Sequence, residues 1–377
     1  MAGVDLELVR ELAVFRAQRG QALSLYLDLD PSTTPTAAGL DARVASLLHE
    51  GRGLADSVPE HAGRVGLVED LGRVARFFDL DFERDGALGV AVFSDGPDDL
   101  WRVIELPETV RDEVWIGDEL HVAPLAPLTA PYREALVAVV GREQGLLLEL
   151  VAGRLVPIAE RFDEQPGRHD QGGWSQANYQ RHIENLVLEH LRDVAGQVDE
   201  ELRARPRRPA LILVGTDETT ASFAERLSVE ARAAVVGTAH AEAHATPSQL
   251  LALVTPLVEQ AEARAERTVL DGWRESAGRH GRATTGWEET LAAASDGKVA
   301  TLLFREGAAR PARRCPECGR VEAVVARCPL DDAAMERLPD GLDGAIRQTL
   351  RFGGELVPIR HHQDLDPVGG IGALLRF

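Results

Sequence analysis

The chain has 377 residues, which is more than one hydrophobic core usually accommodates, so we expect two or three domains. A net charge of −20 argues against nonspecific adhesion to nucleic acid, and no apolar run approaches the length of a membrane span. The N-terminus lacks an apolar signal segment, and three late cysteines are too few for a secreted disulfide framework. We therefore expect a cytoplasmic protein with no membrane partner.

An N-terminal α/β domain is expected over residues 1–125. It opens with helical spacing, and hydrophobic patterns then predict a strand, two helices and three further strands. These elements are expected at 23–29, 38–54, 62–80, 88–93, 101–106 and 114–116. Three prolines between Pro124 and Pro131 predict a linker after this domain.

A second domain is expected over residues 131–275. It begins with a three-stranded meander, followed by a glycine loop and a long helix from about 175 to 203. Strands and helices then alternate, which predicts a mixed sheet covered by helices. The strands are expected at 136–140, 146–151, 155–158, 211–214 and 234–236, and two later helices from 218 and over 247–274. The long helix has apolar residues at intervals of three and four, so one face is expected to be buried, at Tyr179, Ile183, Leu186, Val187, Leu191, Val194 and Val198.

A third domain is expected over residues 280–377, with a cysteine-bearing insertion at about 311–335. Its helices are expected at 287–294 and 343–350, and its strands at 299–304 and 355–359. The chain ends in a glycine-rich segment, where Gly369, Gly370 and Gly372 are typical of strand turns and close packing.

The insertion holds the sequence Cys-Pro-Glu-Cys and, nine residues later, Cys-Pro-Leu-Asp. Structural zinc takes four ligands in tetrahedral geometry, often from two such turns. The pattern predicts a structural Zn²⁺ in a zinc-ribbon-like insertion, with the ligands Cys315, Cys318, Cys328 and Asp331. Other candidates for the fourth ligand are Asp332, His361 and His362. The alternative hypothesis is that the two cysteine turns (the knuckle, residues 315–331) have lost zinc and fold without it.

Residues 168–186 read RHDQGGWSQANYQRHIENL, a polar loop with two adjacent glycines and one tryptophan before the long helix. Glycine pairs occur where the backbone needs positive φ or approaches a neighbour closely. The tryptophan either packs onto its own helix or is presented to a partner. Basic residues around the loop form a local positive patch or are solvated surface residues, and they are Arg154, Arg161, Arg168 and Arg181.

Sequence motifs of common enzymes are missing: we find no Walker loop, no GxSxG and no HExxH. The sequence GTDETT at 215–220 follows a predicted strand and could hold a phosphate at a helix N-terminus. Helix capping by Thr216 or Asp217 explains the same residues more simply.

The glycine loop, placed after a meander and before Ser-Gln and a long helix, resembles the GGQ loop of the archaeal and eukaryotic class-I peptide chain release factors. The tail DLDPVGGIGALLRF at 364–377 looks like the C-terminal signature of that family, and the N-terminal SLYLD is similar to its bacterial branch. The resemblance implies an α/β fold of three domains. The middle domain would be RNase H-like, and the C-terminal domain would be an α/β sandwich that carries the zinc insertion.

The loop departs from the family pattern at one position. Gly172 and Gly173 match the two glycines and Ser175 matches the serine, but Trp174 replaces the catalytic glutamine. An indole has one donor and no acceptor, so it cannot place a water as an amide does, although it can stack on a base. Gln176 could act in its place if the loop were re-registered. The resemblance thus implies catalytic residues Gly172, Gly173 and Gln176, and ribosome contacts at Trp174, Ser175, Arg168 and Arg181.

The function implied is that of a ribosome-associated translation factor in hibernation or rescue. It would bind the tRNA (A) site of the 70S ribosome and project the GGW loop to the peptidyl-transferase centre. A translational GTPase such as elongation factor Tu is a further candidate partner. Two other hypotheses stay open: a peptidyl-tRNA hydrolase acting on stalled ribosomes, and a tRNA-binding, RNA-binding or adaptor protein away from the ribosome. Whether the chain is an enzyme is left open by the missing glutamine.

Overall fold

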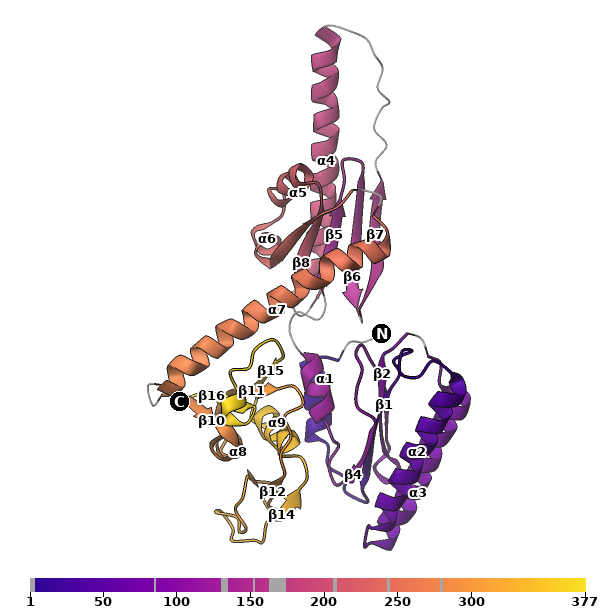
Figure 1. Ribbon diagram of the computed structural model, residues 1–377, viewed down its shortest axis with the longest axis vertical. Coiled ribbons are helices and arrows are strands. Elements are labelled where there is room, and N and C mark those ends of the chain that lie inside the picture. The colour runs from indigo at the N-terminus through magenta and orange to yellow at the C-terminus, as the bar shows by residue number, and fades with distance from the viewer. Residues whose placement is uncertain are drawn as a thin grey trace. The chain divides into compact units, whose positions relative to one another are not determined.

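A computed structural model describes residues 4–84, 86–129, 135–151, 153–162, 174–205, 209–242, 245–278 and 281–377, with the backbone alone at 160–162 and 174–184. The chain divides into two compact units. Unit 1 comprises Met1–Ala130 and Glu266–Phe377, and unit 2 comprises Pro131–Ala265. Both units are mixed α/β, as expected (Figure 1).

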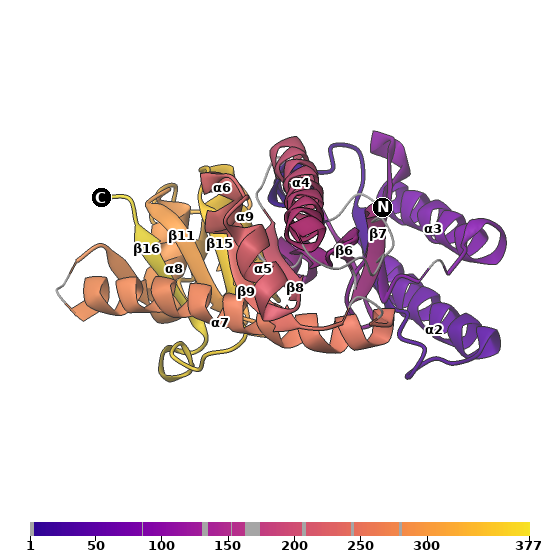
Figure 2. The same ribbon diagram turned by 90° about the horizontal axis from the view of Figure 1, so that it is seen from above.

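The N-terminal part of unit 1 is an antiparallel sheet of strand order β3-β2-β1-β4. Leu23, Leu25 and Leu27 of the central strand pack against helices α2 and α3, which lie side by side on one face (Figures 1 and 2). The alternate residues Ala22 and Tyr26 face a second core. The elements are α1 (Leu6–Val14), β1 (Ala22–Asp28), α2 (Ala37–Asp56), α3 (His61–Arg76), η1 (Phe77–Asp81), β2 (Gly89–Asp95), η2 (Gly96–Asp98), β3 (Leu100–Leu106) and β4 (Glu113–Gly117).

The C-terminal part of unit 1 shares this second core with α1 and the N-terminal sheet. Its sheet has the order β10-β16-β11-β15, in which β11 and β15 are parallel and the other neighbours antiparallel. A small sheet of order β13-β12-β14 lies in the cysteine-bearing insertion. The elements are β10 (Ala283–Thr285), α8 (Gly286–Ser295), β11 (Val299–Arg305), β12 (Ala312–Arg314), β13 (Val321–Glu322), β14 (Glu336–Leu338), α9 (Gly341–Arg351), β15 (Glu355–Ile359), η4 (Asp366–Val368) and β16 (Ile371–Leu375). The division into three domains stays a prediction.

The proline-rich stretch expected as a linker is different in the structure. Ala123–Thr129 forms a 3₁₀ helix, η3, and Leu125, Ala126 and Pro127 are buried in unit 1. The linker prediction is therefore wrong up to Thr129, because alternating prolines and apolar residues here fill a core. Pro131 lies outside the described residues.

Unit 2 has a five-stranded sheet of order β7-β6-β5-β8-β9. Strands β5, β8 and β9 are parallel, whereas β6 and β7 extend the sheet as an antiparallel meander. Helices α4, α5 and α6 cover one face and α7 covers the other (Figure 2). The elements are β5 (Ala135–Val140), β6 (Gln144–Val151), β7 (Arg154–Phe162), α4 (Trp174–Ala204), β8 (Ala210–Gly215), α5 (Asp217–Ala224), α6 (Val229–Ala234), β9 (Val235–His240) and α7 (Pro247–Gly278).

The glycine-rich end of the chain forms η4 and the inner strand β16. Gly369 and Gly370 have φ of +78° and +83°, values that non-glycine residues rarely adopt. A Cβ on Gly372 would lie 2.9 Å from Nε1 of Trp273. The expected roles in a turn and in close packing are confirmed.

Candidate functional site

The glycine loop is only partly described by the structure. Arg168, Gly172 and Gly173 lie outside the described residues. The positions of Trp174, Ser175, Gln176 and Arg181 are in the first turns of α4, whose backbone alone is described there. The helix thus begins at the tryptophan, one residue earlier than expected. The grouping of these residues into one site stays a prediction.

Helix α4 is anchored to the sheet through its C-terminal half. Leu191, Val194 and Val198 are buried as predicted, with Ala195 and Leu202 beside them. A Cβ on Gly145 would lie 2.4 Å from Cγ2 of Val194, so strand β6 approaches the helix very closely.

An ion pair holds the end of the same helix. Arg205 donates to the carboxylate of Glu149 on β6 at 2.7 Å and to that of Glu201 at 2.9 Å. This arginine is therefore engaged within the protein. Arg207 and Arg208 lie outside the described residues.

The first turns of α4 extend past the end of the sheet (Figure 1). From Trp174 to Val187, where described packing against the sheet begins, thirteen residues at 1.5 Å each span roughly 20 Å. The amino end of α4 is therefore well separated from the core of unit 2.

Arg154 and Arg161, two of the basic residues considered around the glycine loop, lie near opposite ends of β7. Arg154 pairs with Val151 at the hairpin end of β7, whereas Arg161 pairs with Gly145 near the other end, from which the chain continues to the loop. Seven residues of strand separate the two arginines by roughly 23 Å. The hydrophobic pattern predicted this strand only over 155–158, whereas β7 extends to Phe162, so the separation of the two arginines could not be predicted.

A cavity of about 660 Å³ lies in unit 2 at the carboxyl ends of β5 and β8. Open α/β sheets often bind ligands at such ends. Thr216 lines the cavity, but its hydroxyl caps α5 by accepting from the backbone N–H of Thr219 at 3.3 Å. Asp217 and Glu218 occupy the first turn of α5, where they would oppose a phosphate. The capping interpretation of GTDETT is confirmed.

The cysteine-bearing insertion contains two turns of matching geometry. In the first, the backbone N–H of Gly319 donates to the carbonyl of Cys315 at 3.0 Å, and Gly319 has φ of +75°. In the second, the N–H of Asp332 donates to the carbonyl of Cys328, also at 3.0 Å, and Asp332 has φ of +59°. Asp331 thus occupies the position that corresponds to Cys318.

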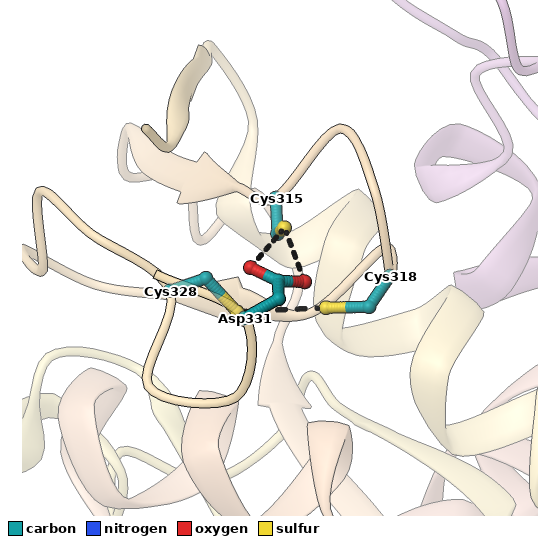
Figure 3. A group of neighbouring side chains, drawn as sticks. All are labelled: Cys315, Cys318, Cys328 and Asp331. Atoms are coloured by element: carbon teal, nitrogen blue, oxygen red, sulfur yellow. Dashed lines mark hydrogen bonds between the residues drawn. The ribbon is translucent and has the colours of Figure 1, made fainter. Parts of the chain in front are cut away.

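The two turns bring four potential ligands together (Figure 3). The ligand atoms of Cys315, Cys318, Cys328 and Asp331 all lie within 4.8 Å of one another. The Sγ atoms of Cys318 and Cys328 are 3.5 Å apart, and Sγ of Cys315 is 3.4 Å from Oδ2 of Asp331. The backbone N–H of Leu330 donates to Sγ of Cys328 at 3.5 Å. The four residues could bind a metal ion.

The charge states of Asp331 and Cys318 depend on this crowding. A hydrogen bond from the backbone N–H of Ala333 lowers the pKa of Asp331 to about 2, so this carboxylate is ionised. Burial raises the pKa of Cys318 to about 12. A divalent cation would reverse that effect, because it stabilises the thiolate directly.

The other candidates for a fourth ligand lie elsewhere in the described structure. Asp332 forms an ion pair with Arg327 at 3.0 Å. His361 is 4.0 Å from Glu266, and Nδ1 of His362 is 2.8 Å from a guanidinium nitrogen of Arg267. Of the four candidates, only Asp331 belongs to the group around the cysteines.

A buried charge cluster in unit 1 was not predicted from the sequence. His121 is 4% exposed and stacks on Trp115, with ring centroids 4.5 Å apart. Its Nδ1 is 3.4 Å from Asp343, and its Nε2 is 3.4 Å from Glu113 and 4.0 Å from Asp340. Burial alone would lower the pKa of His121, but contacts with Asp343 and Glu113 raise it to about 10.

Asp343 connects the two sequence segments of unit 1. Its Oδ1 accepts from the backbone N–H groups of Val122 and Ala123, and its Oδ2 accepts from Nε of Arg347 at 2.8 Å. Arg347 in turn donates to the carbonyl of Ala13 at 2.7 Å. Burial disfavours the charge of Asp343, yet Arg347 and His121 lower its pKa well below the usual range. Partners more than 200 positions apart leave no local signal in the sequence.

Comparison with known protein families shows which of them a part of this chain resembles. Residues 121–262, which span β5 to β9 and the glycine loop, match bacterial archaeo-eukaryotic release factor family 10. Over these residues the chain is release-factor-like. No curated protein matches it.

Solved structures similar to this release-factor-like chain include an archaeal translation termination factor, aRF1, at 16% identity, with 98% of this chain and 96% of that chain covered and a TM-score of 0.28. Pelota from Archaeoglobus fulgidus is 15% identical, with 77% and 79% covered and a TM-score of 0.32. A model of ribosome-bound archaeal Pelota and ABCE1 is 13% identical, with 74% and 72% covered and a TM-score of 0.44. At these scores the assignment rests on the sequence match. Among the described helices, none has both the length and the apolar character of a membrane span.

Proposed function

We propose that this release-factor-like chain is a ribosome-associated translation factor that acts in ribosome hibernation or rescue. It would occupy the tRNA (A) site and direct Gly172, Gly173 and Trp174 toward the peptidyl-transferase centre. The family match carries this proposal, because the matched residues include the glycine loop. The proposal treats unit 2 as the RNase H-like middle domain of the family and the C-terminal part of unit 1 as its α/β sandwich.

The position of the loop supports the proposal. It directly precedes α4, whose first turns extend roughly 20 Å beyond the sheet. A loop at the tip of a long helix can reach a narrow site while the body of the domain stays outside. Glycines at 172 and 173 would let its backbone approach RNA closely.

The chemistry of position 174 favours blocking over hydrolysis. An indole cannot accept a hydrogen bond from water, but it can stack on a nucleobase. Gln176 is two residues further along the helix, and residues two apart lie on different faces. The glutamine could take the place of Trp174 only if the first turn unwound.

We propose that the knuckle holds Zn²⁺ as a structural ion. Three thiolates and one carboxylate on two matching turns fit the tetrahedral set that structural zinc prefers. Cys315, Cys318, Cys328 and Asp331 would bind the ion and close the insertion between β12 and β14. A translational GTPase as escort stays a prediction.

The decisive experiment is sedimentation of the purified protein with 70S ribosomes, either vacant or loaded with peptidyl-tRNA, at two salt concentrations. Binding to vacant ribosomes is expected for hibernation, and binding only to loaded ribosomes is expected for rescue. A protein that binds neither, but retains tRNA alone, would refute the proposal in favour of a role away from the ribosome.

The variant Trp174→Ala tests the loop itself. Losing one base stack should weaken ribosome binding by about tenfold, since a stack contributes roughly 1–3 kcal/mol. Trp174→Phe should retain most of the affinity, because the phenyl ring still stacks. Equal affinities of all three proteins would contradict a stacking role.

Peptidyl-tRNA hydrolysis is the second candidate function, because Gln176 lies within the first turn after the glycines. It predicts that the wild type releases a labelled peptide from stalled ribosomes and that Gln176→Ala does not. A wild type that binds stalled ribosomes without releasing peptide would reject this function.

A further inference from the structure

A second cavity, of about 350 Å³, lies within unit 1 between α1, α9 and the first knuckle turn. The chain as a whole carries a net charge of −20, yet four arginines line this cavity against three carboxylates. The charged lining residues that matter here are Arg16, Arg314, Arg347, Arg351, Glu119 and Glu317.

Three of the four arginines form ion pairs within the protein, and one of them, Arg347, binds Asp343 at 2.8 Å. Arg314 binds Asp118 at 2.6 Å and Glu119 at 2.7 Å, and Arg16 binds Asp118 at 3.1 Å. Glu119 lines the β4 side of the cavity together with Arg16 and Arg314. The N–H donors that remain available to a ligand therefore lie on α9.

Arg347 and Arg351 are one turn apart on α9 and therefore share a face of the helix. Arg347 is 7% exposed, and its Nε and Nη1 are used by Asp343 and Ala13, but its buried Nη2 has no hydrogen-bond partner among the described residues. Buried donors are nearly always satisfied in proteins, so this unpaired donor requires an explanation, and an acceptor bound in the cavity would provide one.

Arg351 supplies a second donor group beside the knuckle. Its Nη1 lies 3.8 Å from the position that a Cβ on Gly319 would occupy, and Nε2 of Gln348 lies 3.9 Å from the same point. Its guanidinium lies 5.7 Å from the ring centroid of Phe352, and no ion pair joins it to a carboxylate in the part of the chain that the structure describes.

We propose that this cavity binds a phosphate-type oxyanion between Arg347 and Arg351. Guanidinium groups match the oxygens of phosphate in pairs, and partial burial strengthens such charge-assisted hydrogen bonds. Free phosphate and the backbone phosphate of RNA present the same chemistry. Glu317 is an exposed carboxylate that lines the same cavity, so its negative charge should oppose binding of an anion.

The test uses the full-length protein and inorganic phosphate, with sodium chloride adjusted to keep ionic strength constant. Phosphate should raise Tm in a saturable manner. Arg351→Gln should weaken the apparent affinity about tenfold or more, because it removes a charge-assisted contact. Glu317→Gln should strengthen binding. Arg52→Gln, which removes an exposed arginine of α2 outside the cavity, is the matched control and should have no effect.

The source of the phosphate is tested by competition with a short single-stranded RNA. Displacement of phosphate by the RNA would identify a backbone phosphate as the ligand, and saturable binding without displacement would identify a free anion. The proposal is overturned if phosphate leaves Tm unchanged, or if the response is the same in wild type and Arg351→Gln. Because Arg351 is exposed, this variant is expected to fold, whereas Arg347 also holds α1 to α9.

Discussion

The two units of this release-factor-like chain differ in what they bury. Unit 1 buries carboxylates and their partners, among them Asp70, Asp95, His121, Asp343 and Arg347. Unit 2 surrounds its sheet with two apolar cores, and His190 is the one titratable residue buried among its described side chains. Packing of apolar surface responds little to pH or metal, whereas buried charges respond strongly.

Changes in pH or metal content should therefore alter the stability of unit 1 and leave that of unit 2 nearly unchanged. Amide hydrogen exchange can follow both in one sample, because β11 and β15 report on unit 1 while β5 and β8 report on unit 2. Unit 2 then serves as an internal reference.

Removal of the metal should produce the largest difference in stability between the two units. If the knuckle holds zinc, a chelator or the variant Cys328→Ser should destabilise residues 312–338 locally by up to about 10 kcal/mol, because metal binding is coupled to folding. Exchange in β12 and β14 should become fast, while β5 and β8 stay protected. Asp331→Cys is the control, since a fourth thiolate should retain the ion.

A knuckle with unchanged protection after chelation, in protein shown to contain no zinc, would instead support an insertion that folds without metal. The different responses of the two units would then be due to the buried charges of unit 1 alone.

Raising the pH should have the next largest effect, through His121. Its pKa is about 10 in the folded protein, against about 6.5 when unfolded, so folding favours the protonated form. The stabilisation is complete below pH 6.5 and is lost as the pH rises to 10, by about 3–5 kcal/mol. Urea unfolding of unit 1 at pH 7 and pH 10 measures this loss.

The variant His121→Gln isolates the histidine from other groups that titrate in this range. It should be less stable than wild type at pH 7, and its stability should change much less between pH 7 and pH 10. An equal pH dependence in both proteins would show that His121 is not the source.

The smallest expected effect is a gain in stability, on neutralising the carboxylate of Asp95. Asp95 is fully buried, neither carboxylate oxygen makes a hydrogen bond to the described residues, and burial next to Asp98 raises its pKa to about 6. A carboxyl with a raised folded pKa costs stability as the pH rises above its unfolded pKa, and the cost is complete above the folded pKa. Asp95→Asn should therefore stabilise unit 1 at pH 7.5 by about 1–3 kcal/mol.

The gain from Asp95→Asn should shrink as the pH falls from about 6 and disappear below about pH 3, where the wild-type carboxyl is protonated in both states. Asp98→Asn provides the contrast, because Asp98 accepts from the backbone of Gln18 and from Arg19 and should lose stability on neutralisation. A stabilising Asp98→Asn would contradict this account of the cluster.

The sequence by itself determined the elements whose causes are local. Alternating leucines predicted β1, periodic apolar residues predicted α4, and Thr216 was recognised as a cap of α5. The clustering of Cys315, Cys318, Cys328 and Asp331 could also be predicted, because two turns of the same spacing bring their first and fourth residues close together. Such features depend on residues a few positions apart, which a sequence displays directly.

Tertiary structure alone decided which distant segments share a core. It buried η3, which looked like a linker, placed Arg154 and Arg161 near opposite ends of β7, and joined His121 and Asp343 across 222 positions. The energy of a buried charge depends on partners and on the exclusion of water, and neither is encoded by local spacing. For that reason the pH response of unit 1 and its arginine-lined cavity become visible only once the chain is folded.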